Sequence, residues 1–204
     1  MTADAVVHLI DDDDGVRQAV AFLLATSGFA VRVYESAAAF LDALASVQPG
    51  CIVTDVRMPG MDGLTLQREL KARGIGLPVI VITGHADVPL AVEAMKAGAV
   101  DFIEKPFNDE SLLSAIRVAI DCHLRNARRD EEVGAIKAKL DSLSSREREV
   151  LDGLIAGLPN KSIAYDLKIS ARTVEVHRAN LMSRMGARSV ADLVRMVFVV
   201  RPPA

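Results

Sequence analysis

The 204-residue chain is predicted to fold as a doubly wound α/β domain followed by a smaller all-α domain. Three observations support this fold class. Short apolar segments alternate with helix-like segments five times in the first part of the chain. Most of these apolar segments are nearly continuous runs, as expected for parallel strands that are buried on both faces. After about residue 140, helical periodicity remains and no further strand pattern is apparent.

Five segments are expected to form strands, because they are short, rich in β-branched residues and bounded by Gly, Pro or acidic residues. They are VVHLI (6–10), AVRVY (30–34), CIVT (51–54), PVIVIT (78–83) and VDFIE (100–104). Helices are expected at about 14–27, 36–46, 64–73, 87–97 and 109–125. Strand–helix alternation of this kind favours a parallel sheet covered by helices on both faces.

The domain boundaries are expected at 1–123 for the α/β domain, 124–140 for a charged and partly helical linker, and 141–204 for the helical domain. Ser144 followed by Glu147 predicts a capping box that opens a helix to about residue 156. Asn160 and Ser170 are expected to cap helices that end near residues 167 and 185, and a fourth helix covers about 188–199.

Charge is divided unevenly along the chain. Residues 1–137 carry 13 Lys and Arg against 20 Asp and Glu, a net charge of −7, whereas residues 138–204 carry 11 against 7, a net charge of +4. A basic helical half suggests nucleic acid as a partner. The two cysteines form no metal-ligand pattern, and neither an export signal nor an apolar run of membrane-spanning length is visible, so no membrane association and a cytoplasmic protein are expected.

Functional groups stand at the carboxyl ends of the predicted strands, where doubly wound sheets hold their sites. These groups are Asp11 and Asp12 after the first strand, Asp55 after the third, Thr83 after the fourth and Lys105 after the fifth. If the first and third strands are neighbours, three carboxylates converge, and each pair at about 4 Å costs roughly 1 to 4 kcal/mol. Mg²⁺ would offset this repulsion.

The motifs IDDDDGVR, TDVRMPGMDG, VITGH and DFIEKPF, in this order and spacing, resemble the receiver domain of two-component response regulators, which has the flavodoxin/CheY-like fold. The resemblance implies that Asp55 is the phosphoacceptor, and that Asp11, Asp12, Asp55 and the backbone carbonyl of Arg57 hold Mg²⁺. Thr83 and Lys105 would bind the phosphoryl oxygens. It also implies that Phe102 is the aromatic switch residue, and that the Lys105–Pro106 bond is cis.

The neighbours of the acidic pair are given a simpler interpretation. Asp13 and Asp14 are expected to cap the following helix, where the helix dipole favours negative charge. An acyl phosphate formed on Asp55 adds about two negative charges, and Thr83 and Phe102 then respond by moving. The receiver would thus assist its own phosphorylation and dephosphorylation without being an enzyme for an outside substrate.

The segment from about 143 to 195 resembles the LuxR-type helix-turn-helix domain. Helical spacing of Ile163, Leu167, Val174 and Leu181 predicts a small apolar core, and the turn at 168–170 precedes the longer helix that reads DNA in this motif. The residues expected to contact bases or phosphates are Lys161, Arg172, Thr173, Glu175, Val176, Arg178, Ala179, Asn180 and Arg184.

Together the two resemblances imply a transcriptional activator of nitrogen-fixation genes that a sensor histidine kinase of the FixL kind phosphorylates. Double-stranded promoter DNA and RNA polymerase are the further partners. Phosphorylation is expected to release the DNA-binding half and to favour a homodimer. The family's dimer face corresponds here to Val88, Val92, Met95, Lys96 and Asp101.

Two alternatives remain open at the level of the sequence. One is a free-standing phosphohydrolase that uses the Mg²⁺–aspartate site, although no cap segment or second acid is apparent and the DNA-binding half would be unexplained. The other is a DNA-binding regulator whose receiver works without phosphate. The complete acceptor set argues against the second alternative.

Overall fold

A computed structural model describes residues 5–84 and 88–201. The chain divides into two compact units, with the boundary between Asn126 and Ala127. The first unit contains a five-stranded, fully parallel sheet with the strand order β2-β1-β3-β4-β5. Its strands are β1 (Val6–Ile10), β2 (Ala30–Tyr34), β3 (Gly50–Asp55), β4 (Val79–Thr83) and β5 (Asp101–Glu104). The predicted α/β class and its five strands are confirmed.

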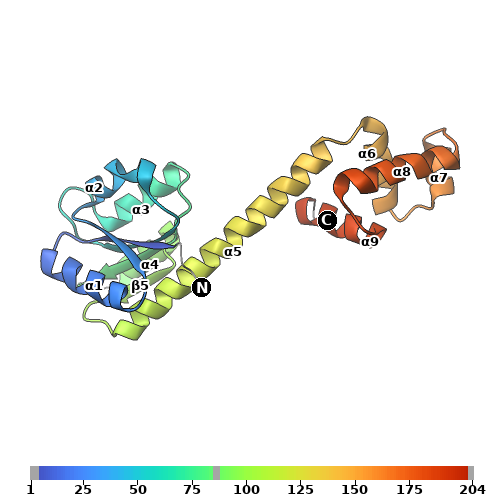
Figure 1. The fold of residues 1–204 in the computed structure, drawn as a ribbon. Helices are drawn as coiled ribbons and strands as arrows, with labels where there is room; N and C mark the ends of the chain where they lie inside the picture. The colour runs from blue at the N-terminus through green and yellow to red at the C-terminus, as the bar shows by residue number, and fades with distance from the viewer. Residues whose placement is uncertain (1–4, 85–87, 202–204) are drawn as a thin grey trace. The chain divides into compact units, whose positions relative to one another are not determined.

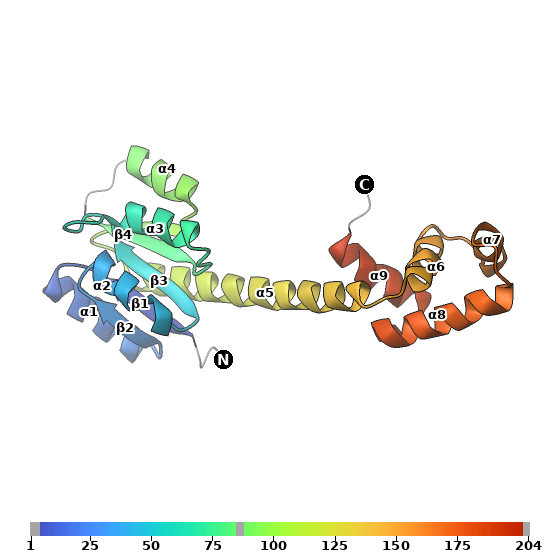
Figure 2. The same ribbon diagram turned by 90° about the horizontal axis from the view of Figure 1, so that it is seen from above.

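Helices cover both faces of the sheet (Figures 1 and 2). One core packs α1 (Asp14–Thr26) and the first part of α5 (Asp109–Asp141) against the sheet through side chains such as Leu24 and Ile116. The other core lies under α2 (Ala37–Asp42), α3 (Gly63–Ala72) and α4 (Val88–Ala97). The central strands β1, β3 and β4 are buried almost throughout, which explains why their sequences do not alternate.

Two helices of the first unit differ from the sequence prediction. The segment predicted as one helix at 36–46 is the short α2 followed by a 3₁₀ turn, η1 (Leu44–Ser46). The predicted helix at 109–125 continues without a break to Asp141, so the whole charged segment is helical. Residue 87, where the fourth helix was predicted to begin, and His85 of the VITGH motif lie outside the described residues.

The helix starts have identifiable chemical causes. Asp13 is the N-cap of α1, and its carboxylate accepts a hydrogen bond from the backbone N–H of Val16 at 3.0 Å, while Asp14 lies in the first turn. The predicted cap is confirmed for Asp13, whereas Asp14 is the first helical residue, where the helix dipole favours its negative charge. The Lys105–Pro106 bond is cis, also as predicted. No helix in the described parts of the chain is both long and apolar enough to cross a membrane.

The second unit packs α6 (Ser145–Ile155), α7 (Asn160–Asp166), α8 (Ala171–Met185) and α9 (Val190–Val200) around one apolar core, to which the end of α5 also contributes. Ser144 and Glu147 form the predicted capping box at α6, and Ser170 caps α8. The cap predicted for Asn160 is wrong. Asn160 is already the first helical residue, so Pro159 occupies the N-cap position of α7. A proline side chain has no hydrogen-bonding atom, and no side chain makes the capping hydrogen bond.

Candidate functional site

Three carboxylates meet at the carboxyl edge of the sheet. Strands β1 and β3 are direct neighbours, with Ile10 paired to Thr54, so the residues that follow them come together. One carboxylate oxygen from each of Asp11, Asp12 and Asp55 lies within 4.8 Å of the others. Asp11 is fully buried, Asp55 is partly buried and Asp12 is exposed, so the cluster opens to solvent on one side.

Lys105 connects two of these carboxylates. Its Nζ lies 2.7 Å from Asp11 Oδ2 and 2.8 Å from Asp55 Oδ2. Burial raises the pKa of Asp11, and the contact with Lys105 opposes that shift. Burial alone would lower the pKa of Lys105, but its hydrogen bonds to Asp11 and Asp55 outweigh it and raise the pKa overall. With three anions and one cation, the cluster retains excess negative charge that a divalent cation would neutralise.

Backbone groups fix the orientation of the carboxylates. The N–H of Asp13 donates to Asp11 Oδ1 at 2.9 Å, and the N–H of Arg57 donates to Asp55 Oδ1 at 3.1 Å. Arg57 is therefore adjacent to the cluster, and the ligand role predicted for its carbonyl stays a prediction. Arg17 also supports the site, since its guanidinium donates to the backbone carbonyl of Asp11 at 2.7 Å.

Thr83 and Phe102 lie on the two strands next to this cluster. Thr83 ends β4, and its side chain is buried. Phe102 on β5 pairs with Val81 on β4, and Val81 lies two residues before Thr83 on β4. Because residues two apart on a strand share a face, Phe102 and Thr83 are on the same face of the sheet. Phe102 is partly buried against the core of that face. The placement is compatible with the predicted switch, which stays a prediction.

Gly63 is a site residue that the sequence analysis missed. It begins α3, and a Cβ at this position would stand 2.2 Å from the backbone carbonyl oxygen of Asp55. Its N–H donates to the carbonyl of Val56 at 2.9 Å. Any larger residue at position 63 would displace the backbone of Asp55. The signal in the sequence that could have indicated this constraint is a glycine directly after Asp62, the N-cap of α3.

The second candidate site is the outward face of α8. The turn at 168–170 connects α7 to α8, and Lys168 adopts a positive φ of 55° within it. Val174 and Leu181 are buried, as predicted, which turns the opposite face of the helix to solvent. The predicted contact residues exposed there are Arg172, Glu175, Val176, Ala179, Asn180 and Arg184.

Three of the predicted contact residues are engaged within their own domain. Thr173 exchanges a hydroxyl hydrogen bond with Ser170 at 2.8 Å, and Arg178 contacts Asn160 at 3.4 Å. Arg184 donates to the Ser142 carbonyl at 2.9 Å and pairs with buried Glu147 at 3.3 Å. Hydrogen bonding from the Ser144 backbone lowers the pKa of Glu147, and Arg184 adds to this effect. Lys161, on α7, is exposed.

A third surface contains the predicted dimer face on α4 and β5. Val88, Val92 and Met95 are large apolar side chains that remain 77%, 45% and 50% exposed. Lys96 and Asp101, the predicted charge pair, are also exposed. Apolar side chains grouped on one helix face and flanked by charges are typical of a surface that a partner covers.

Comparisons with known proteins match both units. The model of the response regulator receiver domain matches residues 7–117, and that of the luxR family of bacterial regulatory proteins matches residues 141–197. The transcriptional regulatory protein FixJ of Azorhizobium caulinodans is 55% identical over 193 residues, covering 95% of this chain and 92% of that protein. FixJ of Rhizobium meliloti is 56% identical over 194 residues, 95% of each. The structure of response regulator StyR superposes with a TM-score of 0.86 at 41% identity, covering 95% of this chain and 98% of that chain.

Proposed function

We propose that phosphorylation of Asp55 controls the binding of this chain to DNA. The proposal proceeds from its family: the chain is a two-component transcriptional regulator, which belongs to the response regulators that join a receiver domain to a LuxR-family DNA-binding domain. The phosphoryl donor in this proposal is a sensor histidine kinase of the FixL kind. The observation that carries the proposal is the convergence of Asp11, Asp12, Asp55 and Lys105 at one edge of the sheet.

The donor set fits Mg²⁺. Asp11, Asp12 and Asp55 offer three hard oxygen ligands within 4.8 Å of one another, and the exposed side of the cluster leaves room for water ligands. The carbonyl of Arg57 is the further ligand in this proposal. When bound, Mg²⁺ would neutralise negative charge on the carboxylates and on the transferring phosphoryl group.

The residues of the chain then have distinct roles in the transfer. A carboxylate oxygen of Asp55 attacks phosphorus, the bond from phosphorus to the kinase histidine breaks, and an acyl phosphate forms. Lys105 already holds Asp55 by its Oδ2 and would shift to a phosphoryl oxygen as that group arrives. Thr83 would donate its hydroxyl hydrogen to another phosphoryl oxygen.

The switch follows from packing around the new group. Movement of Thr83 toward the phosphoryl group would free space on its face of the sheet, and Phe102, on the same face, would turn inward. Phosphorylation would thereby favour one of two packings of α4 and β5. The exposed side chains Val88, Val92 and Met95 on α4, with Lys96 and Asp101, would then form the dimer interface.

The output of this switch is transcription. In the proposal, the α8 face contacts promoter DNA, and the dimer recruits RNA polymerase to nitrogen-fixation genes. The FixJ relatives support this regulatory target. A reporter fused to a nitrogen-fixation promoter should respond to the wild-type chain with its kinase and not to the Asp55→Asn variant. Equal activation by both would contradict control by phosphorylation.

The acceptor assignment is tested by intact mass after incubation with acetyl phosphate and Mg²⁺. The wild-type chain should gain one phosphoryl group, and Asp55→Asn, which keeps the size of the side chain and removes the nucleophilic oxygen, should gain none. Chelation of Mg²⁺ should abolish labelling of the wild type. Labelling of both proteins would contradict the assignment, and steady release of phosphate from small esters would favour a phosphohydrolase instead.

A further inference from the structure

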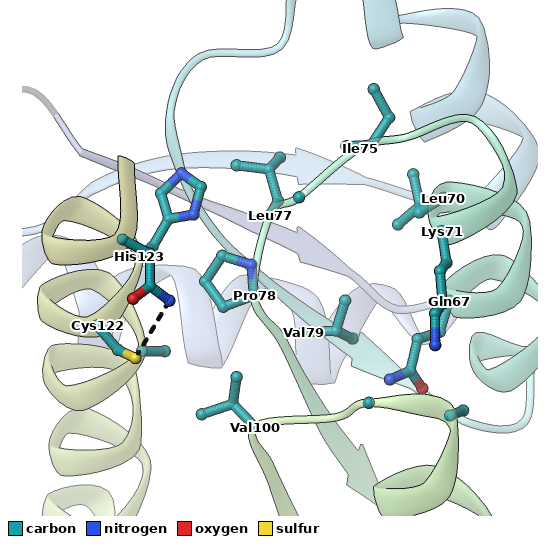
Figure 3. A pocket seen from close by; sticks show the side chains of 15 residues that line it. Gln67, Leu70, Lys71, Ile75, Leu77, Pro78, Val79, Val100, Cys122 and His123 are labelled. Atoms are coloured by element: carbon teal, nitrogen blue, oxygen red, sulfur yellow. Dashed lines mark hydrogen bonds between the residues drawn. The ribbon is translucent and has the colours of Figure 1, made fainter. Parts of the chain in front are cut away.

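A hollow of about 310 Å³ lies at the amino end of the sheet, opposite the edge that holds Asp55 (Figure 3). It is enclosed by α3, the segment from α3 to β4, the starts of β4 and β5, the end of α4, and α5. All of its lining residues belong to the first unit. The phosphorylation chemistry proposed above uses none of them.

Gln67 is the unusual residue in this hollow. The residue is only 4% exposed, and neither its Nε2 nor its Oε1 atom has a hydrogen-bond partner among the described residues. In Figure 3 the amide end points away from α3 toward the connection between α4 and β5, where a Cβ added at Gly98 would stand 4.0 Å from Nε2. Buried polar groups are almost always paired, because leaving them unpaired is costly, so an amide with two unpaired atoms calls for a partner from outside the chain.

The remaining walls of the hollow are mostly apolar. Leu70, Ile75, Leu77, Pro78, Val79 and Val100 line it, with Lys71 and His123 also contributing. A water molecule accounts for about 30 Å³, so the hollow is several times larger than one water needs. Its volume lies at the lower end of the range for small-molecule sites, which combine apolar walls with a few polar groups that fix orientation.

We propose that this hollow binds a small ring compound that carries a carboxamide or lactam edge. The Gln67 side chain can donate through Nε2 and accept at Oε1 on one planar edge. A ligand with an N–H beside a C=O matches both atoms at once, whereas a hydrocarbon would leave them unpaired. The apolar walls would hold the ring.

Binding here would reach two elements with other assigned roles. The hollow contacts Ala97 and Gly98 at the end of α4, the helix that carries the predicted dimer face, and Cys122 and Asn126 on α5. The proposal concerns ligand binding alone and stands whether or not Asp55 is phosphorylated.

The test uses the full-length, isotopically labelled chain and two probes followed by nuclear magnetic resonance. Benzamide carries the required edge, and N,N-dimethylbenzamide has a similar ring without the N–H donors. Benzamide should shift the side-chain amide signals of Gln67 and the backbone signals of Gly76 and Gly98, in a saturable manner. Its affinity should exceed that of the dimethyl compound about tenfold, since one lost hydrogen-bonded edge is worth roughly that factor.

Matched variants separate the site from general effects. Gln67→Leu keeps the bulk of the side chain and should lose about tenfold in affinity for benzamide, while Gln18→Leu, the same change on α1, should bind as the wild type does. If Gln67→Leu fails to fold, Leu77→Trp, which narrows the hollow, supplies the comparison and should abolish binding. The proposal would be overturned by any of three results. These are no binding of benzamide, equal affinity of the wild type for the two probes, or equal affinity for benzamide of the wild type and either Gln67→Leu or Leu77→Trp.

Discussion

Lys105 lies between Asp11 and Asp55, and this position gives one side chain two opposing effects. Its ammonium group offsets repulsion between the carboxylates, which supports the site before any cation arrives. The same contacts occupy oxygen atoms that Mg²⁺ would use. Under the proposed function, Lys105 would therefore compete with Mg²⁺ for Asp11 and Asp55 in the resting site and would bind the phosphoryl group once it is transferred.

Replacing this lysine should separate the two effects. Lys105→Gln should bind Mg²⁺ several-fold more tightly, because a positive charge beside the metal ligands is removed, and yet accept phosphoryl groups at least tenfold more slowly from acetyl phosphate. Isothermal titration with Mg²⁺ and intact-mass time courses measure the two quantities. Lys137→Gln, at an exposed position on α5, is the control and should change neither. Weaker Mg²⁺ binding by Lys105→Gln would contradict the competition.

His8 is a second residue with a predictable response, this time to pH. It lies fully buried on β1, its Nε2 is 2.9 Å from the carbonyl oxygen of Gln48, and its Nδ1 is 3.4 Å from the Tyr34 hydroxyl. Because a carbonyl oxygen can only accept, Nε2–H donates to it. Burial lowers the pKa of His8 below its usual value of 6.5.

The sign of the pH effect follows from that direction. Below pH 6.5 the unfolded chain binds a proton at His8 and the folded chain does not, so stability should fall as the pH decreases from about 6.5 toward the lower folded pKa. The slope from this residue is at most about 1.4 kcal/mol per pH unit. Urea unfolding at several pH values measures it, and His8→Gln should reduce the slope. His123→Gln, at a partly exposed position, serves as control. An unchanged slope in His8→Gln would contradict the interpretation.

At the scale of one element, α8 carries arginines of two kinds. Arg172 is exposed in the first turn, whereas Arg184, near the end, contacts Ser142 and the buried carboxylate of the α6 capping box. The sequence assigned both to DNA. The structure gives Arg184 a further task in holding α8 to the start of α6.

The two arginines should therefore respond differently to truncation. Arg172→Ala should weaken DNA binding for all sequences and reduce the slope of log affinity against log salt by about 1, with little change in stability. Arg184→Ala should lower the unfolding free energy by about 1 kcal/mol or less, because the pair is half exposed and solvent screens it. Salt-dependent binding assays and urea unfolding of the full chain measure the two effects. Identical behaviour of the variants would contradict the distinction.

At the scale of the whole molecule, one helix belongs to both units. The first part of α5 supplies Leu112 and Ile116 to the core of the receiver, and its last part supplies Ile136 and Leu140 to the core of the helical domain. The segment 125–135 between them is rich in Arg, Glu and Ala, which favour helix, and most of its side chains are exposed. The charged linker, which was predicted to be partly helical, is thus part of one continuous helix.

Phosphorylation should also change the state of association of the whole chain. The chain with acetyl phosphate and Mg²⁺ should sediment as a dimer, and Val92→Asp should remain monomeric while still accepting one phosphoryl group, because a charge in the apolar face opposes its burial. Val118→Asp places the same charge at another exposed valine, outside the predicted face, and should dimerise normally. Unchanged sedimentation of the wild type would contradict phosphorylation-driven dimerisation.

The sequence by itself determined the α/β class, the five strands, the capping residues at α1, α6 and α8, and the groups that stand at the strand ends. These features depend on local periodicity and on short motifs, which a chain displays without being folded. The tertiary structure decided which of those groups touch. Lys105 reaches Asp11 and Asp55 across 94 and 50 residues, and this contact requires β1 and β3 to be neighbours. The close approach of Gly63 to Asp55, the engagement of Arg184 with Glu147 and the unpaired amide of Gln67 likewise arise from packing between distant segments, which no local pattern encodes.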